Sequence, residues 1–125
     1  MSKKTFTITD LSREFDLTTR AIRFYEDCGL LSPGRKGRTR IYSPRQRVRL
    51  KLILRGKRLG FSLKEIQEVL DMYDADCGEA GQLKFLMQKI RERRDYLHVQ
   101  KQDIEATLRD LREIEEECLR RLHSM

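Results

Sequence analysis

The sequence predicts a mainly α-helical protein in two parts: a head of four short helices and one β-hairpin, then a single long helix. Two observations predict this architecture. The first 73 residues consist of short amphipathic segments that begin with helix-capping residues. A glycine-containing break separates the second of these segments from the third. From residue 82 onward an apolar residue recurs at every seventh position without a proline. We therefore expect a head over residues 1–73, a linker over 74–81 and a long helix over 82–122.

Charge is distributed unevenly along the 125 residues, which carry a net charge of +7. Residues 1–64 hold 17 lysines and arginines against 5 aspartates and glutamates, a net charge of +12. Residues 65–125 hold 10 lysines and arginines against 15 aspartates and glutamates, a net charge of −5. A basic head favours a polyanionic partner, with nucleic acid first and anionic lipid as the alternative.

Composition also excludes several classes of protein. No apolar run approaches the ~20 residues of a membrane span, and no apolar stretch follows the first lysines as in a secretory signal. Three widely spaced cysteines do not predict a disulfide framework, so we expect a reducing, cytoplasmic location. No catalytic constellation is visible, so we expect neither an enzyme nor a bound cofactor.

Two short helices near the N-terminus predict a helix-turn-helix. Thr9 is the expected N-cap of the first helix, which carries Leu11 and Phe15 on one face and ends at residues 16–17. Thr18 is the expected N-cap of the second helix, and Gly29 ends it. Taken alone, this pattern is equally typical of any pair of antiparallel helices.

The segment from residue 33 to residue 42 predicts a β-hairpin, or wing. Gly34 and Gly37 provide turn conformations, and residues 39–42 favour a strand. The tip of the wing is expected to carry Arg35, Lys36 and Arg38.

Two further helices complete the predicted head. Ser43 followed by Pro44 predicts the start of the third helix. We expect its buried side to be marked by Val48, Leu52 and Leu59. A capping box of Ser62 and Glu65 begins the fourth helix. Its single apolar stripe is Ile66, Val69, Leu70 and Tyr73.

The long helix carries an uninterrupted seven-residue repeat, which predicts a coiled coil. The repeat, called the seam below, consists of Leu83, Ile90, Leu97, Ile104, Leu111 and Cys118. Forty helical residues make a rod of about 60 Å, which a head of fewer than 80 residues cannot cover. A second copy of the chain is the economical partner, so we expect a homodimer.

The segment Arg23-Phe24-Tyr25-Glu26, followed by Gly29-Leu30-Leu31-Ser32-Pro33, resembles the MerR family of bacterial transcription regulators. The resemblance continues through residues 40–42 and 59–66, and it covers residues 7–73 closely. It implies a winged helix-turn-helix head and an antiparallel coiled-coil dimer centred near residues 96–101. It also implies a regulator that binds a palindromic promoter operator, distorts the DNA in response to an effector, and acts on RNA polymerase indirectly through the shared promoter.

The candidate DNA-binding residues lie on the second helix and the wing. An arginine at the start of a recognition helix can bind guanine or phosphate. Tyr25 matches a family position that contacts the DNA backbone, whereas Phe24 is expected in the core of the head. The candidate set is Thr18, Thr19, Arg20, Arg23, Tyr25, Arg35, Lys36, Arg38, Arg40 and Tyr42. The third-helix arginines at positions 45, 47, 49 and 55 are ambiguous between DNA contact and solvation.

Two effector classes follow from the resemblance. Residues 60–83 resemble the LiuR-type regulators linked to leucine and isovalerate catabolism, which implies a small organic or acyl-CoA effector. The alternative is a metal-sensing regulator, in which Cys77 combines with Cys118 and His123 of the other chain in a Cys₂His site suited to Zn²⁺. Because Cys118 occupies a seam position where a hydrophobic residue belongs, we favour no metal. Cys28, at the end of the second helix, is expected to be a small buried residue.

One further class is a coiled-coil adaptor without specific DNA binding. The long helix over residues 82–122 would be sufficient for such an adaptor, but an adaptor does not explain the net charge of +12 on residues 1–64.

Overall fold

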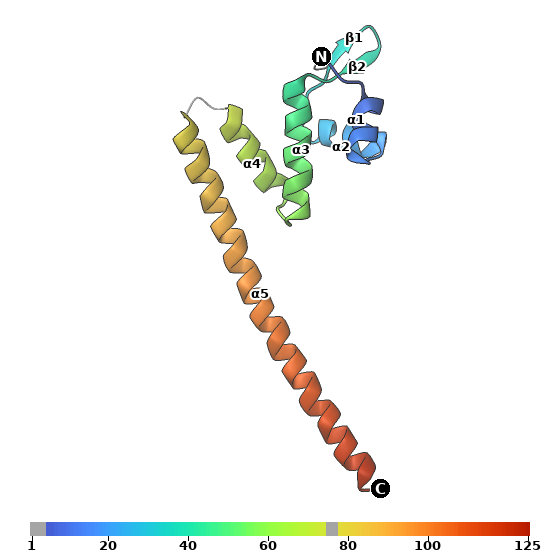
Figure 1. The fold of residues 1–125 in the computed structure, drawn as a ribbon, viewed down its shortest axis with the longest axis vertical. Coiled ribbons are helices and arrows are strands. Elements are labelled where there is room, and N and C mark those ends of the chain that lie inside the picture. The colour runs from blue at the N-terminus through green and yellow to red at the C-terminus, as the bar shows by residue number, and fades with distance from the viewer. Residues whose placement is uncertain (1–4, 75–77) are drawn as a thin grey trace. The chain divides into compact units, whose positions relative to one another are not determined.

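The structure, a computed structural model, describes residues 5–74 and 78–125 and is mainly helical, which confirms the predicted fold class (Figure 1). The chain divides into two compact units, residues 1–82 and residues 83–125. The elements follow the order α1 (Ile8–Phe15), α2 (Thr19–Asp27), β1 (Gly34–Lys36), β2 (Thr39–Ile41), α3 (Pro44–Arg58), α4 (Leu63–Asp74) and α5 (Gly78–His123). Within the described ranges, no helix combines the length and hydropathy that crossing a membrane requires.

Helix α1 begins two residues earlier than the sequence predicted. Its N-cap is Thr7, whose hydroxyl accepts a hydrogen bond from the Asp10 amide at 3.1 Å. The Asp10 carboxylate accepts one in return from the Thr7 amide at 2.9 Å. This reciprocal pair satisfies two amides at once, which Thr9 could not do without an acidic residue three positions later. The helix ends at Asp16, which has a left-handed backbone with φ +53°.

The predicted starts of the other three short helices are confirmed. Thr18 and Ser43 accept amide hydrogen bonds at the N-termini of α2 and α3, at 3.1 and 3.2 Å. Ser62 and Glu65 form the predicted capping box before α4, with hydrogen bonds of 3.0 and 3.1 Å. Gly29 follows the end of α2 with φ +79°, as expected of a residue that reverses a helix end.

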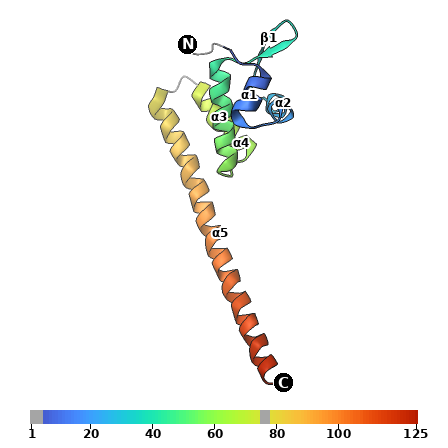
Figure 2. The same cartoon turned by 45° about the vertical axis from the view of Figure 1, so that its right-hand side comes forward.

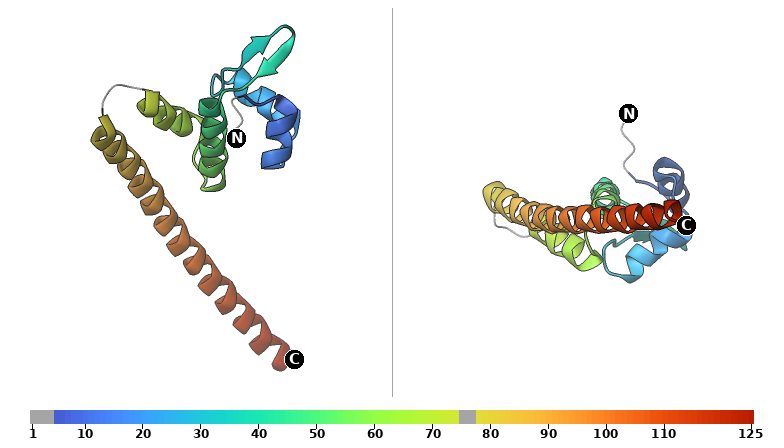
Figure 3. Two further views of the ribbon diagram at one scale, coloured as in Figure 1. Left: turned by 45° about the horizontal axis from the view of Figure 1, so that its top comes forward. Right: turned by 90° about the horizontal axis from the view of Figure 1, so that it is seen from below.

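The core of the head lies where α1, α2, α3 and α4 meet, with α3 between the α1–α2 pair and α4 (Figures 1 and 3). Its buried side chains are Leu11, Ile22, Tyr25, Leu30, Leu31, Tyr42, Leu50, Ile53, Ile66 and Leu70. Half-buried Phe6, Phe15, Phe61 and other side chains pack around this cluster. The core therefore joins all four short helices to the wing through Tyr42.

The predicted buried side of α3 was wrong. Val48 and Leu59 expose 49% and 52% of their surfaces, and Leu52 is only partly buried. Leu50 and Ile53, one helical turn apart, are fully buried instead. Apolar residues occur on several sides of this helix, so periodicity alone did not determine which side would face the neighbouring helices.

Helices α3 and α4 approach closely at Gly56, which sequence analysis did not single out. A Cβ atom at this position would lie 2.9 Å from Cγ1 of the buried Ile66. Glycine is therefore needed here for packing and not for a turn, because it lets the backbone of α3 approach α4.

Gly56→Ala is expected to destabilise the head by about 1 kcal/mol, although alanine normally stabilises a helix by up to ~1 kcal/mol relative to glycine. Overpacking against Ile66 costs about 1–3 kcal/mol and outweighs that gain. Urea unfolding at fixed protein concentration measures the change. Gly34→Ala is the control, because its Cβ would meet only the Ile41 carbonyl at 3.7 Å. A stabilised Gly56→Ala protein would contradict the close approach.

Helix α5 is one uninterrupted helix of 46 residues, about 70 Å long (Figure 2). It begins at Gly78, so residues 78–81 of the predicted linker are helical, while residues 75–77 lie outside the described residues. None of its described side chains is buried. Every residue of the seam is exposed in the single chain, with Leu97 at 43% and Ile104 at 61%.

Candidate nucleic-acid interface

One face of α2 is buried in the core and the opposite face is open to solvent. Ile22 and Tyr25, which are three residues apart, face the core. The exposed side chains of the helix are Arg20, Arg23, Phe24 and Asp27. They lie within about 100° of one another around the helix axis, given 3.6 residues per turn. The open face thus presents two arginines at the start of α2, as the sequence predicted.

The two adjacent aromatic residues of α2 differ from expectation in which of them is buried. Phe24, expected in the core, exposes 49% of its surface, whereas Tyr25 exposes only 4%. Successive residues point about 100° apart on a helix, so only one of them can share the core face with Ile22. The Tyr25 ring also lies 5.6 Å from the Lys57 ammonium. Direct contact between Tyr25 and DNA therefore stays a prediction, with little ring surface to support it.

Cys28 also differs from expectation. It is the C-cap of α2 and is exposed, not a small buried residue.

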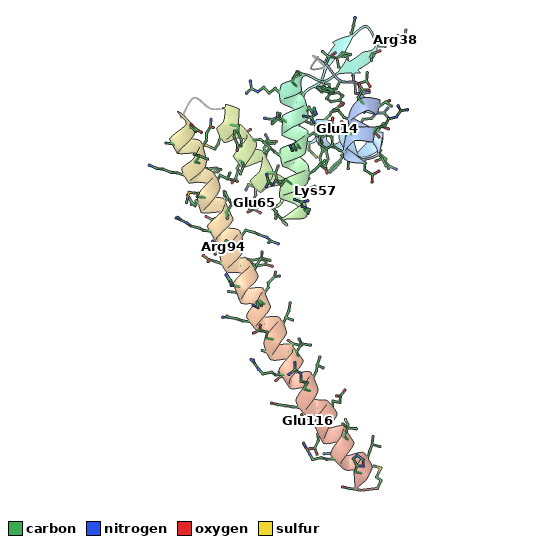
Figure 4. All side chains as sticks on the ribbon, viewed as in Figure 1. Glu14, Arg38, Lys57, Glu65, Arg94 and Glu116 are labelled. Atoms are coloured by element: carbon green, nitrogen blue, oxygen red, sulfur yellow. The ribbon has the colours of Figure 1, made fainter. Side chains whose placement is uncertain are left out.

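The wing is the predicted antiparallel hairpin, with Arg35 opposite Arg40 and Lys36 opposite Thr39. Gly37 begins its two-residue loop with φ +65°, a backbone conformation that favours glycine. The side chains of Arg35, Lys36 and Arg38 are exposed, and Figure 4 shows Arg38 at the end of the hairpin. Cross-strand pairing of Arg35 with Arg40 places like charges side by side, which is unfavourable. The Glu26 carboxylate, which bonds Arg40, offsets part of this repulsion.

Glu26 connects α2 to the wing. Its carboxylate, which is largely buried, accepts a hydrogen bond from Arg40 Nε at 3.1 Å and another from the Tyr42 hydroxyl. Tyr42 is fully buried, so we correct its assignment from DNA contact to positioning of the wing. Burial and the Glu26 hydrogen bond raise the pKa of the Tyr42 hydroxyl well above its usual value, which keeps the donor protonated.

The N-terminal segment also supports the wing. Phe6 and Tyr42 exchange backbone hydrogen bonds of 2.9 and 2.8 Å, forming a bridge beside β2. Neither this bridge nor the role of Glu26 was predicted from the sequence. The signal for Glu26 was a single acidic residue inside the Arg-Phe-Tyr-Glu segment of a strongly basic head.

Tyr42→Phe is expected to lower the free energy of unfolding by about 2 kcal/mol, since a hydrogen bond to a charged group contributes about 1.5–3 kcal/mol. It should also weaken DNA binding, because the wing loses one of its two side-chain bonds to Glu26. Chemical unfolding and a DNA titration measure the two effects. The control is Tyr96→Phe, which removes an exposed hydroxyl bonded to Gln100 on α5. Equal stability of the two variants would show that Glu26 does not hold the wing.

Two of the ambiguous third-helix arginines have structural partners. Arg47 donates to the Glu14 carboxylate, with Nε at 2.9 Å, and this bond lowers the pKa of the Glu14 carboxyl. The Arg47 guanidinium also lies 5.8 Å from the ring centres of Phe6 and Phe15. Arg49 donates to the Leu30 carbonyl at 3.0 Å. Arg47 and Arg49 thus hold α3 to the elements around it.

The remaining candidates stay available for contact. Thr18 is exposed, although its hydroxyl caps α2, and Thr19 is partly buried. Arg40 keeps some exposed surface beside Glu26. The structure therefore places exposed cations on the open face of α2 and on the wing, and joins these two elements through Glu26.

Two of the three residues proposed for a metal site, Cys118 and His123, lie on α5. Cys77 lies outside the described residues. Cys118 is exposed on α5, and His123 is the last residue of the same helix. Five residues of α-helix turn the second side chain about 140° from the first, so the two do not point toward a common ion. Over residues 5–74 and 78–125 of one chain, no group of three potential ligands comes together.

Family comparison matches most of the chain. Residues 6–73 match the family described as MerR HTH family regulatory protein, and residues 47–114 match the one described as MerR, DNA binding. The transcriptional regulator HmrR of Rhizobium leguminosarum bv. viciae is 34% identical over 94 residues, 68% of this chain and 73% of HmrR. The mercuric resistance operon regulatory protein of Bacillus cereus is 34% identical over 112 residues, 88% of this chain and 77% of that protein.

Similar solved structures agree with the family match. A MerR-family transcriptional regulator from Bacillus cereus superposes with a TM-score of 0.68 and 25% identity, covering 90% of this chain and 81% of the other. HiNmlR, a MerR-family regulator lacking the sensor domain and bound to promoter DNA, has a TM-score of 0.52 and 26% identity, covering 75% and 79%. An exposed arginine face on α2, a cationic wing joined to it, and family matches from residue 6 to residue 114 agree with one another. The chain belongs to the MerR family of DNA-binding transcription regulators.

Proposed function

We propose that two copies of this chain bind a palindromic promoter operator through α2 and the wing, and distort the DNA in response to an effector. The observation that carries this proposal is the link between the two elements. Glu26 joins α2, which carries the exposed arginine face, to a hairpin that exposes three cations, Arg35, Lys36 and Arg38. Such an arrangement suits a major-groove helix with flanking phosphate contacts. A protein of this kind acts in the cytoplasm, and it reaches RNA polymerase indirectly through the shared promoter.

The exposed seam of α5 supports a homodimer. The seam leaves five large hydrophobic side chains exposed along one helix, and a second α5 is the partner that matches their seven-residue spacing. The companion positions four residues later are Met87, Arg94, Lys101, Leu108, Glu115 and Leu122. Because several of these residues are charged, charge pairing beside the apolar seam is possible. Figure 4 labels Arg94 in the N-terminal half of α5 and Glu116 in its C-terminal half.

Charge along α5 favours an antiparallel arrangement. Residues 83–101 hold six lysines and arginines against two aspartates and glutamates, a net charge of +4. Residues 102–123 hold four lysines and arginines against seven aspartates and glutamates, a net charge of −3. In an antiparallel pair the basic half of one helix lies beside the acidic half of the other, whereas a parallel pair would align like charges.

Selection of bound duplexes from a random DNA pool tests the proposed function. We expect enrichment of one palindrome with two half-sites, because a two-fold dimer reads two-fold symmetric DNA. Failure to enrich any sequence would support the coiled-coil adaptor. Enrichment of an asymmetric single site would contradict the dimer.

For the effector, we propose a small organic molecule or acyl-CoA, following the resemblance of residues 60–83 to LiuR-type regulators. The seam position of Cys118 and its divergence from His123 support this choice. The metal-sensing alternative is supported by relatives. The mercuric resistance regulator of Bacillus cereus is 34% identical. PbrR691 of Ralstonia metallidurans CH34, solved in complex with lead(II), is 28% identical with a TM-score of 0.53, covering 78% of this chain and 80% of PbrR691.

Cys118→Val separates the two effector classes. If Cys118 is a seam residue, valine fills the same space and the dimer is expected to keep or gain stability. The protein purified without chelator is then expected to hold no stoichiometric metal. If Cys118 is a ligand, Cys118→Val and Cys77→Ser would both abolish tight Zn²⁺ binding under reducing conditions. A metal ion lost in both variants would establish a metal sensor.

A further inference from the structure

Phe24 is a large apolar side chain on an otherwise polar helix face. It exposes 49% of its surface on the open face of α2, near Arg20 and Arg23. Its ring centre lies 5.9 Å from that of Tyr25, with an angle of 56° between the two ring planes. The core position that sequence analysis gave to Phe24 belongs to Tyr25.

We infer that Phe24 reads thymine by packing against its C5-methyl group in the major groove, an inference that rests on the proposed DNA-binding function of α2. The reason is chemical. A phenyl ring donates and accepts no hydrogen bond, so it gains little from phosphate oxygens or from polar base edges. In the major groove the prominent apolar group on a base edge is the thymine methyl.

The two arginines determine how near the ring comes to the bases. Arg20 lies one helical turn before Phe24 and Arg23 directly precedes it, so bonds from either to guanine or phosphate bring this face against the groove. Arginine alone does not distinguish A·T from T·A when it binds phosphate. Phe24 would add that distinction, and it would make the protein sensitive to methyl groups at one position of each half-site.

Replacing thymine by deoxyuridine in the selected operator removes the methyl group and keeps base pairing. At the position read by Phe24 we expect about fourfold weaker binding per methyl, and about fifteenfold when both half-sites are changed. Phe24→Ala should weaken binding to the thymine operator by at least as much. Its affinity should be the same for the thymine and deoxyuridine operators, because the methyl then has no partner.

Val48→Ala is the matched control, because Val48 is equally exposed at 49% but lies on α3. This variant should keep the full deoxyuridine penalty. Unfolding curves of both variants show whether each is folded. The comparison of thymine and deoxyuridine operators with the unmodified protein does not depend on any variant.

Two outcomes would overturn the inference while leaving the proposed function intact. One is specific operator binding with no deoxyuridine position that weakens it. The other is a deoxyuridine penalty that Phe24→Ala retains in full. Absence of any sequence-specific binding would instead refute the proposed function, and this inference with it.

Discussion

Leu97→Asp and Ile104→Asp are each expected to convert the dimer into a monomer and to abolish operator binding. Both residues lie on the seam and are exposed in the single chain, so pairing with a second α5 would bury them. An unpaired carboxylate in that interface costs several kcal/mol. At Leu97 the effect is largest, because the proposed centre of the antiparallel pair brings the two aspartates close together.

Sedimentation velocity at micromolar concentration measures the oligomeric state, and a DNA titration measures binding. Val99→Asp is the matched control, because Val99 is equally apolar and exposed, at 56%, but lies off the seam. It should remain dimeric. A monomeric unmodified protein would refute the role proposed for the seam, and so would a dimeric Ile104→Asp variant that still binds its operator.

Salt is expected to weaken operator binding steeply. With six to ten phosphate contacts per dimer, affinity should fall by about 10³–10⁵ between 50 and 200 mM salt. Arg38→Ala should reduce the slope of log affinity against log salt, since Arg38 lies on the exposed wing. Arg23→Ala should weaken binding too, and it should relax base preference at one position if Arg23 binds a base.

Arg112→Ala provides the control for this prediction, because it removes an exposed cation from α5, off the seam. Its salt slope should match that of the unmodified protein. An affinity that does not change with salt would contradict an interface built from the cationic residues of α2 and the wing.

Local features of the fold were largely predictable from the sequence. Thr18, Ser43 and Ser62 begin their helices because a hydroxyl before a helical segment has a defined hydrogen-bonding role. Thr9 failed as an N-cap because the competing pair of Thr7 and Asp10 satisfies two amides.

Choices that depend on tertiary packing were not predictable. Between the adjacent rings of Phe24 and Tyr25, local sequence does not determine which one faces Ile22. Likewise, the packing of the helices around α3 buries Leu50 and Ile53 and leaves Val48 and Leu59 exposed. Gly56 has no local signature at all, because its reason lies in the side chain of Ile66 on another helix.

In the candidate interface, too, local features were predictable and features that depend on packing were not. The exposed cations on α2 and the wing could be identified from charge and family motif. Burial of Tyr42 and its bond to Glu26 depend on how close two residues sixteen positions apart come in the fold, which the sequence does not reveal.

The mass of the complex with a selected operator duplex tests the central claim most directly. We expect two chains on one duplex that contains both half-sites. Scrambling one half-site should cost at least about a hundredfold in affinity, since each mismatched base pair costs about 1–3 kcal/mol. One chain per duplex, or equal affinity for the full operator and a single half-site, would contradict a dimer that reads a palindrome.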